Sequence, residues 1–169
     1  MTSVTVTNNS KATVNKSRVS KTEIKLATVD EMLAKASVLF EEHYEEIARN
    51  KEVMKLKPDE KAYRNLEEAN QIFILSAWQD DVLIGYSVNF VLNHPHYADL
   101  LLAQNDLLYI KKEMRGSRAG LRLIKETETH ATSLGCKLML WHAKENTALG
   151  AILPRLKYGV QDIIYSKEL

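Results

Sequence analysis

The sequence predicts a mixed α/β (α+β) fold in which a central sheet is flanked by helices. Three observations predict it. Strand-like apolar runs alternate with segments of helical periodicity in the order β-α-α-β-β-β-α-β-α-β. The chain has 169 residues, enough for one domain with a sizeable core. Hydrophobic residues make up 45% of it and charged residues 27%, the balance of a globular protein in water.

The N-terminal residues differ from the rest. Residues 1–21 contain Lys and Arg but no acid, and they lack the apolar region of a signal peptide. We predict a flexible polar arm over 1–21 followed by one domain over 22–169, with a transit peptide as the alternative for the arm.

Composition also limits location and partners. No stretch approaches 18 apolar residues, so no membrane span is expected. Cys136 is the only cysteine, which excludes an intrachain disulfide and a Cys-rich zinc site and favours a reducing, cytoplasmic setting. The net charge of +1 argues against a general nucleic-acid binder.

The first third of the domain reads as a strand and two helices. A strand is expected over 24–28, and Thr28 with Glu31 has the spacing of a capping box. A single helical stripe follows, made of Met32, Leu33, Ala36, Leu39, Phe40, His43, Tyr44 and Ile47. The opposite face carries Glu41, Glu42, Glu45 and Arg49, either as a solvated face or as an acidic rim for a cationic acceptor. A second helix is expected over 59–69.

The middle of the chain predicts a hairpin. Residues 71–78 form a continuous apolar run, 79–81 a tight turn, and 82–91 an alternating strand. In that strand one side would carry Val82, Ile84, Tyr86, Val88 and Phe90. Residues 93–102 read as a connection with a helical turn near Leu100. Its His94, His96 and Asp99 are interpreted as loop residues, and no metal is expected.

The last third predicts strand, helix, strand, helix, strand. The strands are expected over 106–111, 138–143 and 160–166. The helix between the first two would bury Leu121, Ile124, Ala131 and Leu134 and stop at Gly135. Asn146 would cap the second helix, which carries Leu149, Ile152, Leu153 and Leu156.

The turn between the 106–111 strand and the following helix is the segment most typical of a binding site. It presents unpaired N–H groups and the positive end of a helix dipole, an arrangement that suits a diphosphate. Gly116 permits a tight bend and Gly120 a close approach. Arg115, Arg118 and Arg122 would share one side of the helix. The alternative is an ordinary glycine turn with a solvated basic face.

Residues 109–123, Tyr-Ile-Lys-Lys-Glu-Met-Arg-Gly-Ser-Arg-Ala-Gly-Leu-Arg-Leu, resemble the acetyl-CoA motif of the GNAT N-acetyltransferases. That motif is a strand ending in a branched aliphatic residue, four residues, then Q/R-x-x-G-x-G/A opening a helix. Residues 146–158 resemble the later helix of the family, and 141–146 its phage and prophage members. The resemblance covers 26–165 by element order. It implies a mostly antiparallel central sheet and a transferase of the acyltransferase class.

The resemblance also implies a mechanism. Backbone N–H groups of Arg115, Gly116, Ser117, Arg118, Ala119 and Gly120 would hold the diphosphate of acetyl-CoA. Leu108 and Ile110 would pair with the pantetheine arm, and Asn146 would contact it. An amine on a protein or a small molecule would attack directly, with no metal and no covalent intermediate.

Two departures from the family pattern are visible. The central glycine of the motif is Arg118, which would either crowd the diphosphate or pair with it. The usual tyrosine general acid is Leu153, followed by Pro154, which would kink the helix. By sequence the nearest replacements are Tyr158 and Tyr165.

The general base is assigned to His142, with Asp106 second. His142 ends a strand where open sheets place ligands, and its imidazole has a suitable pKa. The alternative for His142 is a histidine that packs between sheet and helix, and the alternative for Asp106 is an ordinary polar residue at the start of a strand.

Three hypotheses follow. The first is an acetyl-CoA-dependent N-acetyltransferase, the second an inactive GNAT module that binds CoA or a protein, and the third a module for anionic ligands or nucleic acid. A second copy of the chain, forming a homodimer, is a further candidate partner.

Overall fold

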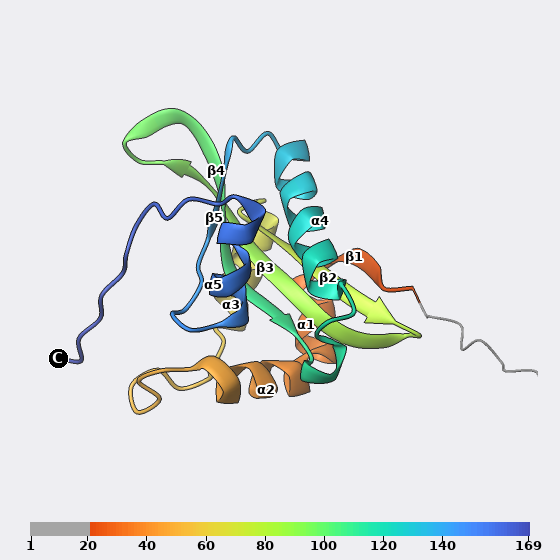
Figure 1. Cartoon of the computed structure of the whole chain (residues 1–169). Coiled ribbons are helices and arrows are strands. Elements are labelled where there is room, and N and C mark those ends of the chain that lie inside the picture. Colours follow the sequence, from red (N-terminus) through yellow and green to blue (C-terminus); the bar gives the residue numbers. More distant parts are fainter. Residues whose placement is uncertain (1–20) are drawn as a thin grey trace, which may run out of the picture.

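Five strands form one sheet in the order β1–β2–β3–β4–β5 (Figure 1). This computed structural model describes residues 21–169, so the arm expected over 1–21 falls outside the described residues except for Lys21. The first four strands are antiparallel to their neighbours, and β5 runs parallel to β4, which confirms the mixed, mostly antiparallel sheet. The strands are β1 Glu23–Ala27, β2 Ile72–Gln79, β3 Val82–His94, β4 Tyr97–Ile110 and β5 Leu138–Trp141.

Helices lie on both faces of the sheet. On one face, α4 (Ala119–Ser133) packs through Leu123 onto Phe73 and Ala103. The other face is covered by α1 (Val29–Lys35), α2 (Ser37–Ile47) and α3 (Glu60–Glu68), and their core includes Met32 and Tyr86. Within residues 21–169, none of the helices combines the length and apolarity that crossing a bilayer requires.

The predicted first helix is two helices. Its capping box is confirmed: Thr28 Oγ1 accepts from the Glu31 N–H at 3.1 Å, and the Glu31 carboxylate accepts from the Thr28 N–H at 3.0 Å. At Ala36, however, φ of −107° and ψ of 6° separate α1 from α2. Ala36 is fully buried, so packing sets the break without a Gly or Pro to mark it.

The connection predicted over 93–102 is wrong. β3 continues to His94 and β4 begins at Tyr97, so a long hairpin turns at residues 95–96. Pairing of Leu92 with Leu102 and of Asn93 with Leu101 extends the ladder into a segment of loop-like composition. Cross-strand pairing therefore overrides local propensity here. No group of three metal-binding side chains exists among residues 21–169.

A β-bulge changes the predicted alternation in β3. Ala77 pairs with Gly85 and Trp78 with Leu83, which leaves Ile84 as the extra residue. Ile84 therefore packs on the α4 side of the sheet, whereas Tyr86 packs on the α1 side. The prediction that these two residues share a face is wrong.

The C-terminal part departs most from expectation. Gly135 ends α4 at a φ of 88°, as predicted, but Leu121 and Leu134 are 40% and 43% exposed rather than buried. The next helix, α5 (Ala148–Ile152), is capped by Thr147 instead of Asn146. Pro154 then opens a 3-10 turn, consistent with the expected interruption. Residues 160–166 form no strand, and their apolar side chains are exposed.

We expect Gly85→Ala to destabilise the protein by about 3 kcal/mol. A Cβ at Gly85 would clash with the Tyr109 carbonyl oxygen and with Ile110 Cδ1, inside the β3–β4 pair. The measurement is urea unfolding. Gly159→Ala is the control, because no atom lies within 4 Å of its Cβ position, and equal stability of the two variants would contradict the expectation.

Candidate functional site

The two last strands of the sheet part from each other at one point. The β4–β5 ladder runs from Leu102–Leu138 to Asn105–Trp141, where β5 ends, while β4 continues to Ile110. Over residues 106–110, the β5 side of β4 thus pairs with no strand in the described part of the chain. An exposed strand edge of this kind can pair with an extended ligand. Leu108 and Ile110 both lie in this segment.

A bulge in β4 marks the point of separation. Val88 pairs with Leu107 and Asn89 with Asn105, so Asp106 is the extra residue. Below it lies a polar cluster with no exposed surface, in which Asn105 Nδ2 donates to Asn89 Oδ1 at 2.9 Å. Thr127 of α4 joins the cluster by donating to Ser87 Oγ at 3.1 Å. Such a buried network fixes the local geometry. Sequence reasoning missed it, because bulges leave no periodic signal.

Asp106 lies in the middle of β4, not at a strand start. It is half-buried, and burial raises the pKa of its carboxyl above the usual range. The charge of the nearby His142 and, to a smaller extent, the Tyr63 hydroxyl act to lower that pKa. His142 is thus near enough to influence the carboxyl of Asp106, and it is the more exposed of the two.

The turn before α4 has free backbone donors. The Arg115 and Ser117 N–H groups donate to the Lys112 and Met114 carbonyls, and the Ala119 N–H donates to Ser117 Oγ. Within residues 21–169, no acceptor meets the N–H groups of Gly116, Arg118, Gly120 and Leu121. Only part of the predicted Arg115–Gly120 set is therefore available for an anion, at the positive end of the 15-residue helix α4.

The basic side chains of this turn have different roles. Arg115 forms two hydrogen bonds of 2.8 Å with the Glu46 carboxylate of α2, and its Nε donates to the Ile110 carbonyl. The hydrogen bonds from Arg115 lower the pKa of Glu46. Arg122 donates to the Thr22 carbonyl. Arg118 is exposed, and its guanidinium makes no hydrogen bond or ion pair with residues 21–169, so it is the arginine of this turn that is available to a ligand.

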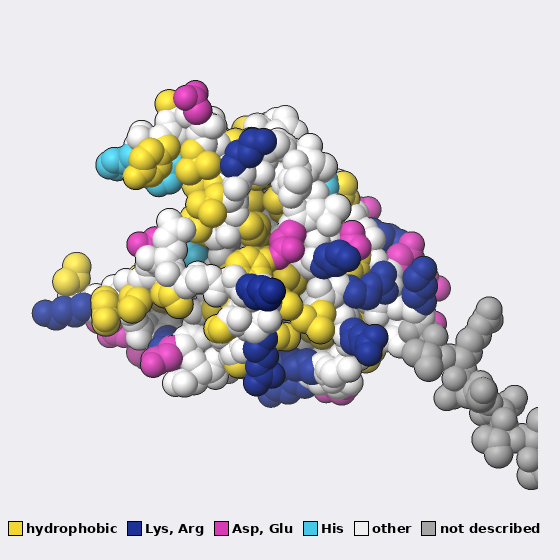
Figure 2. All heavy atoms as spheres, turned by 45° about the horizontal axis from the view of Figure 1, so that its top comes forward, with side chains coloured by type: hydrophobic (Ala, Val, Ile, Leu, Met, Phe, Trp, Pro, Cys, Tyr) yellow, Lys and Arg dark blue, Asp and Glu magenta, His cyan; other side chains and the backbone are white. Residues whose placement is uncertain are grey.

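Figure 2 shows Lys and Arg side chains gathered at the centre of one face and toward the N-terminal side, with apolar surface between them. Lys112, Arg115 and Arg118 are among the exposed cations of the chain. A face of this kind combines attraction for phosphate with an apolar floor.

Arg118 has a φ of 68°, in the left-handed region where the family motif has glycine. We expect Arg118→Gly to raise the free energy of unfolding by about 1 kcal/mol, since a Cβ is unfavourable there. Arg118→Ala keeps the Cβ and is the control. Chemical denaturation of both variants checks the prediction, and a gain for alanine equal to that for glycine would argue against backbone strain.

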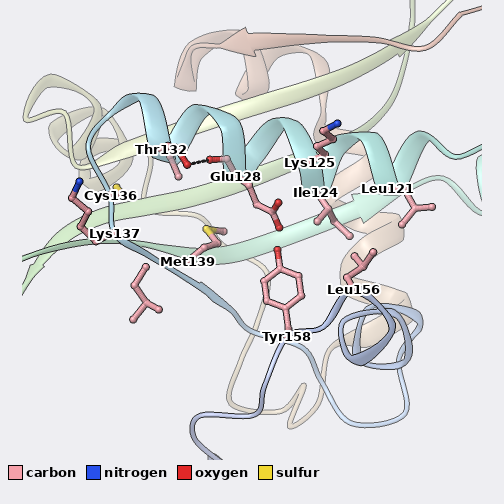
Figure 3. A pocket seen from close by; sticks show the side chains of 12 residues that line it. Leu121, Ile124, Lys125, Glu128, Thr132, Cys136, Lys137, Met139, Leu156 and Tyr158 are labelled. Carbon is pink, nitrogen blue, oxygen red and sulfur yellow. Dashed lines mark hydrogen bonds between the residues drawn. The ribbon is translucent and has the colours of Figure 1, made fainter.

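A cleft of about 780 Å³ lies between α4 and β5 (Figure 3). Leu121 and Ile124 of α4 form one wall, and Leu156 and Tyr158 face them. The ring of Tyr158 packs edge-on against Trp141, with centroids 6.4 Å apart. Of the two predicted substitutes for the general acid, Tyr158 is thus beside the end of β5, whereas Tyr165 is 88% exposed in the C-terminal segment.

Asn146 precedes α5 with a φ of 62° and is exposed. Its side chain makes no hydrogen bond with the described residues. Leu153, at the position where the family often has a tyrosine, is buried and has no hydroxyl.

A second cavity, of about 410 Å³, lies on the opposite face of the sheet, between it and α1, α2 and residues 48–58. Asp106 lines this cavity, as do His43 and Tyr86, whose Nδ1 and hydroxyl groups are 2.8 Å apart. Burial lowers the pKa of His43 to about 4, so its ring is neutral at pH 7. Asp106 thus lines a cavity on the face of the sheet opposite α4.

The chain matches the model of the Acetyltransferase (GNAT) family over residues 38–153. No curated protein matches it.

Solved structures share its fold at low identity. An aminoglycoside acetyltransferase from an uncultured soil metagenomic sample, crystallised with trehalose, is 16% identical with a TM-score of 0.66, covering 88% of this chain and 96% of its own. A ribosomal-protein-alanine N-acetyltransferase from Brucella melitensis biovar Abortus 2308 is 18% identical with a TM-score of 0.63, and the match covers 88% of this chain and 97% of its own. Glucosamine-6-phosphate N-acetyltransferase from Arabidopsis thaliana is 11% identical with a TM-score of 0.63, and the match covers 88% of this chain and 98% of its own.

Proposed function

Since the chain belongs to the GNAT family of acetyltransferases, we propose that it transfers an acetyl group from acetyl-CoA to the amine of an acceptor. One observation carries the proposal. The end of β4, which has no partner strand on its β5 side, leads through a short turn into a helix N-terminus that has free N–H groups and an arginine side chain without a partner. This is the arrangement that an extended thiol arm ending in a diphosphate requires.

Specific residues would hold the cosubstrate. The N–H groups of Gly116, Arg118 and Gly120 would donate to diphosphate oxygens, and the Arg118 guanidinium would pair with a phosphate. Residues 108–110 would pair with the pantetheine arm, and Asn146 would contact it from the α5 side. Arg115 would act indirectly, because its pairing with Glu46 holds the turn in place.

Asp106 and His142 would remove the proton from the acceptor ammonium, since both lie where β4 and β5 part. The amine nitrogen would then bond to the thioester carbon as the carbon–sulfur bond breaks. Tyr158, beside Trp141, is proposed to supply the proton that the departing thiolate takes up.

Two observations favour a second candidate, a GNAT module that binds CoA without turnover. The motif glycine is replaced by Arg118, and the usual tyrosine by a buried leucine, Leu153.

Isothermal titration with acetyl-CoA and with free CoA tests both candidates. Micromolar binding followed by turnover with an amine panel supports the enzyme, and binding without turnover supports the second candidate. Absence of binding to either compound would reject both.

Three finer assignments accompany the proposal. The 141–146 segment supports a phage or prophage type, and the lone Cys136 a cytoplasmic location. A homodimer is proposed because the outer edge of β5 has no partner strand within the described chain, while Val160, Ile163 and Ile164 are exposed. Light scattering on the full chain tests the dimer, and a monomer would reject it.

A further inference from the structure

The cavity that contains Asp106 has an uneven distribution of charge. Among residues 21–169, four cations line it, and Asp106 is the one carboxylate that does so. The cations come from two segments that meet at its mouth: Arg49, Lys55 and Lys57 from residues 48–58, and Lys144 from the segment after β5. All four are exposed, whereas Asp106 is half-buried.

The positive charge at this mouth is not neutralised inside the described chain. Arg49 Nη2 donates to the Glu145 carbonyl, and Lys144 Nζ donates to the Ile47 carbonyl at 2.9 Å. Both acceptors are uncharged backbone groups, and none of the four cations is in an ion pair with residues 21–169. Burial and the charge of Arg49 lower the pKa of Lys144, as expected for crowded cations.

The acids of α2 do not offset these cations. Glu42 accepts a hydrogen bond from Tyr109, Glu45 pairs with Lys51, and Glu46 pairs with Arg115. None of them lines the cavity. The acidic rim considered for Glu41, Glu42 and Glu45 therefore does not form at this cavity, and a polycationic acceptor would meet repulsion at its mouth.

The rest of the lining is apolar. Met32, Phe40 and Leu107 are among the side chains that form the walls. A volume of about 410 Å³ suits a small molecule. One carboxylate, apolar walls and a positive mouth together describe the complement of a molecule with an ammonium group, an apolar body and an anionic group.

We propose that the acceptor is a small amine that carries an apolar group and a carboxylate, as an apolar α-amino acid does. This inference rests on the proposed function and specifies its acceptor. The ammonium group lies toward Asp106 and gives up its proton there, and the nitrogen then takes the acetyl group from the thioester as CoA leaves as the thiol. The carboxylate of the acceptor remains at Arg49, Lys55, Lys57 and Lys144.

The test compares L-leucine, L-methionine and L-phenylalanine with their amides and with spermidine as acceptors. We expect kcat/KM to favour the acids over spermidine. In Lys55→Gln/Lys57→Gln we expect the acid-to-amide ratio of kcat/KM to fall roughly fivefold or more, the worth of two exposed ion pairs. This change in ratio is independent of the different amine pKa values of acid and amide.

A charge-matched control is Lys25→Gln/Lys61→Gln, which removes two lysines from β1 and α3 outside the cavity. Its acid-to-amide ratio should equal that of the unmodified protein. A binding readout uses 3-phenylpropionate, which has the carboxylate but no amine. It should raise the thermal unfolding midpoint of the unmodified protein and the control, but not of the Lys55/Lys57 variant.

The possible outcomes distinguish a failure of the acceptor inference from a failure of the proposed acetyltransferase function. Turnover of spermidine or of peptides in preference to every amino acid would overturn the inference and leave the acetyltransferase standing. An unchanged ratio in the Lys55/Lys57 variant would also overturn it. Failure to bind acetyl-CoA would instead reject the proposed function.

Discussion

Gly120→Trp is expected to lower the affinity for CoA by at least about a hundredfold while the protein stays folded. The N–H group of Gly120 has no acceptor within residues 21–169, and its Cα lies in the first turn of α4. An indole there would occupy the space of the diphosphate. Losing two charge-assisted hydrogen bonds costs about 3 kcal/mol, which is roughly a hundredfold in affinity.

Gly120→Ala is the matched control for this variant. Its Cβ would lie 3.7 Å from Ile110 Cγ1, an ordinary contact, so the alanine variant should keep its affinity. Isothermal titration measures both variants, and circular dichroism checks that they fold. If the folded Gly120→Trp variant kept its affinity for CoA, the proposal that this turn binds the diphosphate would be wrong.

The second large effect is expected at the proposed bases. Asp106→Asn and His142→Ala should each lower kcat by about 10²-fold, the usual worth of a general base. CoA affinity should stay unchanged in both, because neither side chain lies at the turn before α4. A variant with a near-normal rate would show that its residue is not the base.

The pH dependence provides an independent check on Asp106. Burial raises its pKa above the usual 3.8, so kcat should decline as the pH falls through this raised value and the carboxylate is protonated. The same shift means that stability is lost as the pH rises from 3.8 through the raised pKa. Asp106→Asn should therefore raise the free energy of unfolding at pH 7, and this gain should vanish below about pH 4. Urea unfolding at several pH values measures it, and a loss of stability at pH 7 would contradict the burial argument.

Local signals in the sequence predicted much of the fold. Thr28 with Glu31 and Gly135 are cap positions whose chemistry depends on a few neighbouring residues, and both act as predicted. Asp59 caps α3 by accepting from the Ala62 N–H, in agreement with a helix that starts there. The position of the turn before α4 could also be predicted from local sequence, because strand, turn and helix follow one another along the chain.

The parts that could not be predicted depend on distant residues. The break at Ala36 and the bulge at Asp106 arise from packing and strand register, which have no period in the sequence. The group of cations at the cavity that contains Asp106 forms only because Arg49 lies near Lys144, which follows it by nearly a hundred positions in the sequence. The positive φ of Arg118 could not be predicted from its residue type either, because arginine rarely adopts this conformation.

The paired hydrogen bonds between Arg115 and Glu46 join the two proposed binding sites mechanically. Arg115 belongs to the turn before α4, and Glu46 to α2, whose other side chains line the cavity that contains Asp106. A ligand that displaces the turn must either break both bonds or carry α2 with it. If binding at the turn moved α2 in this way, it would alter the cavity, and by thermodynamic reciprocity each ligand would alter the affinity for the other by the same factor.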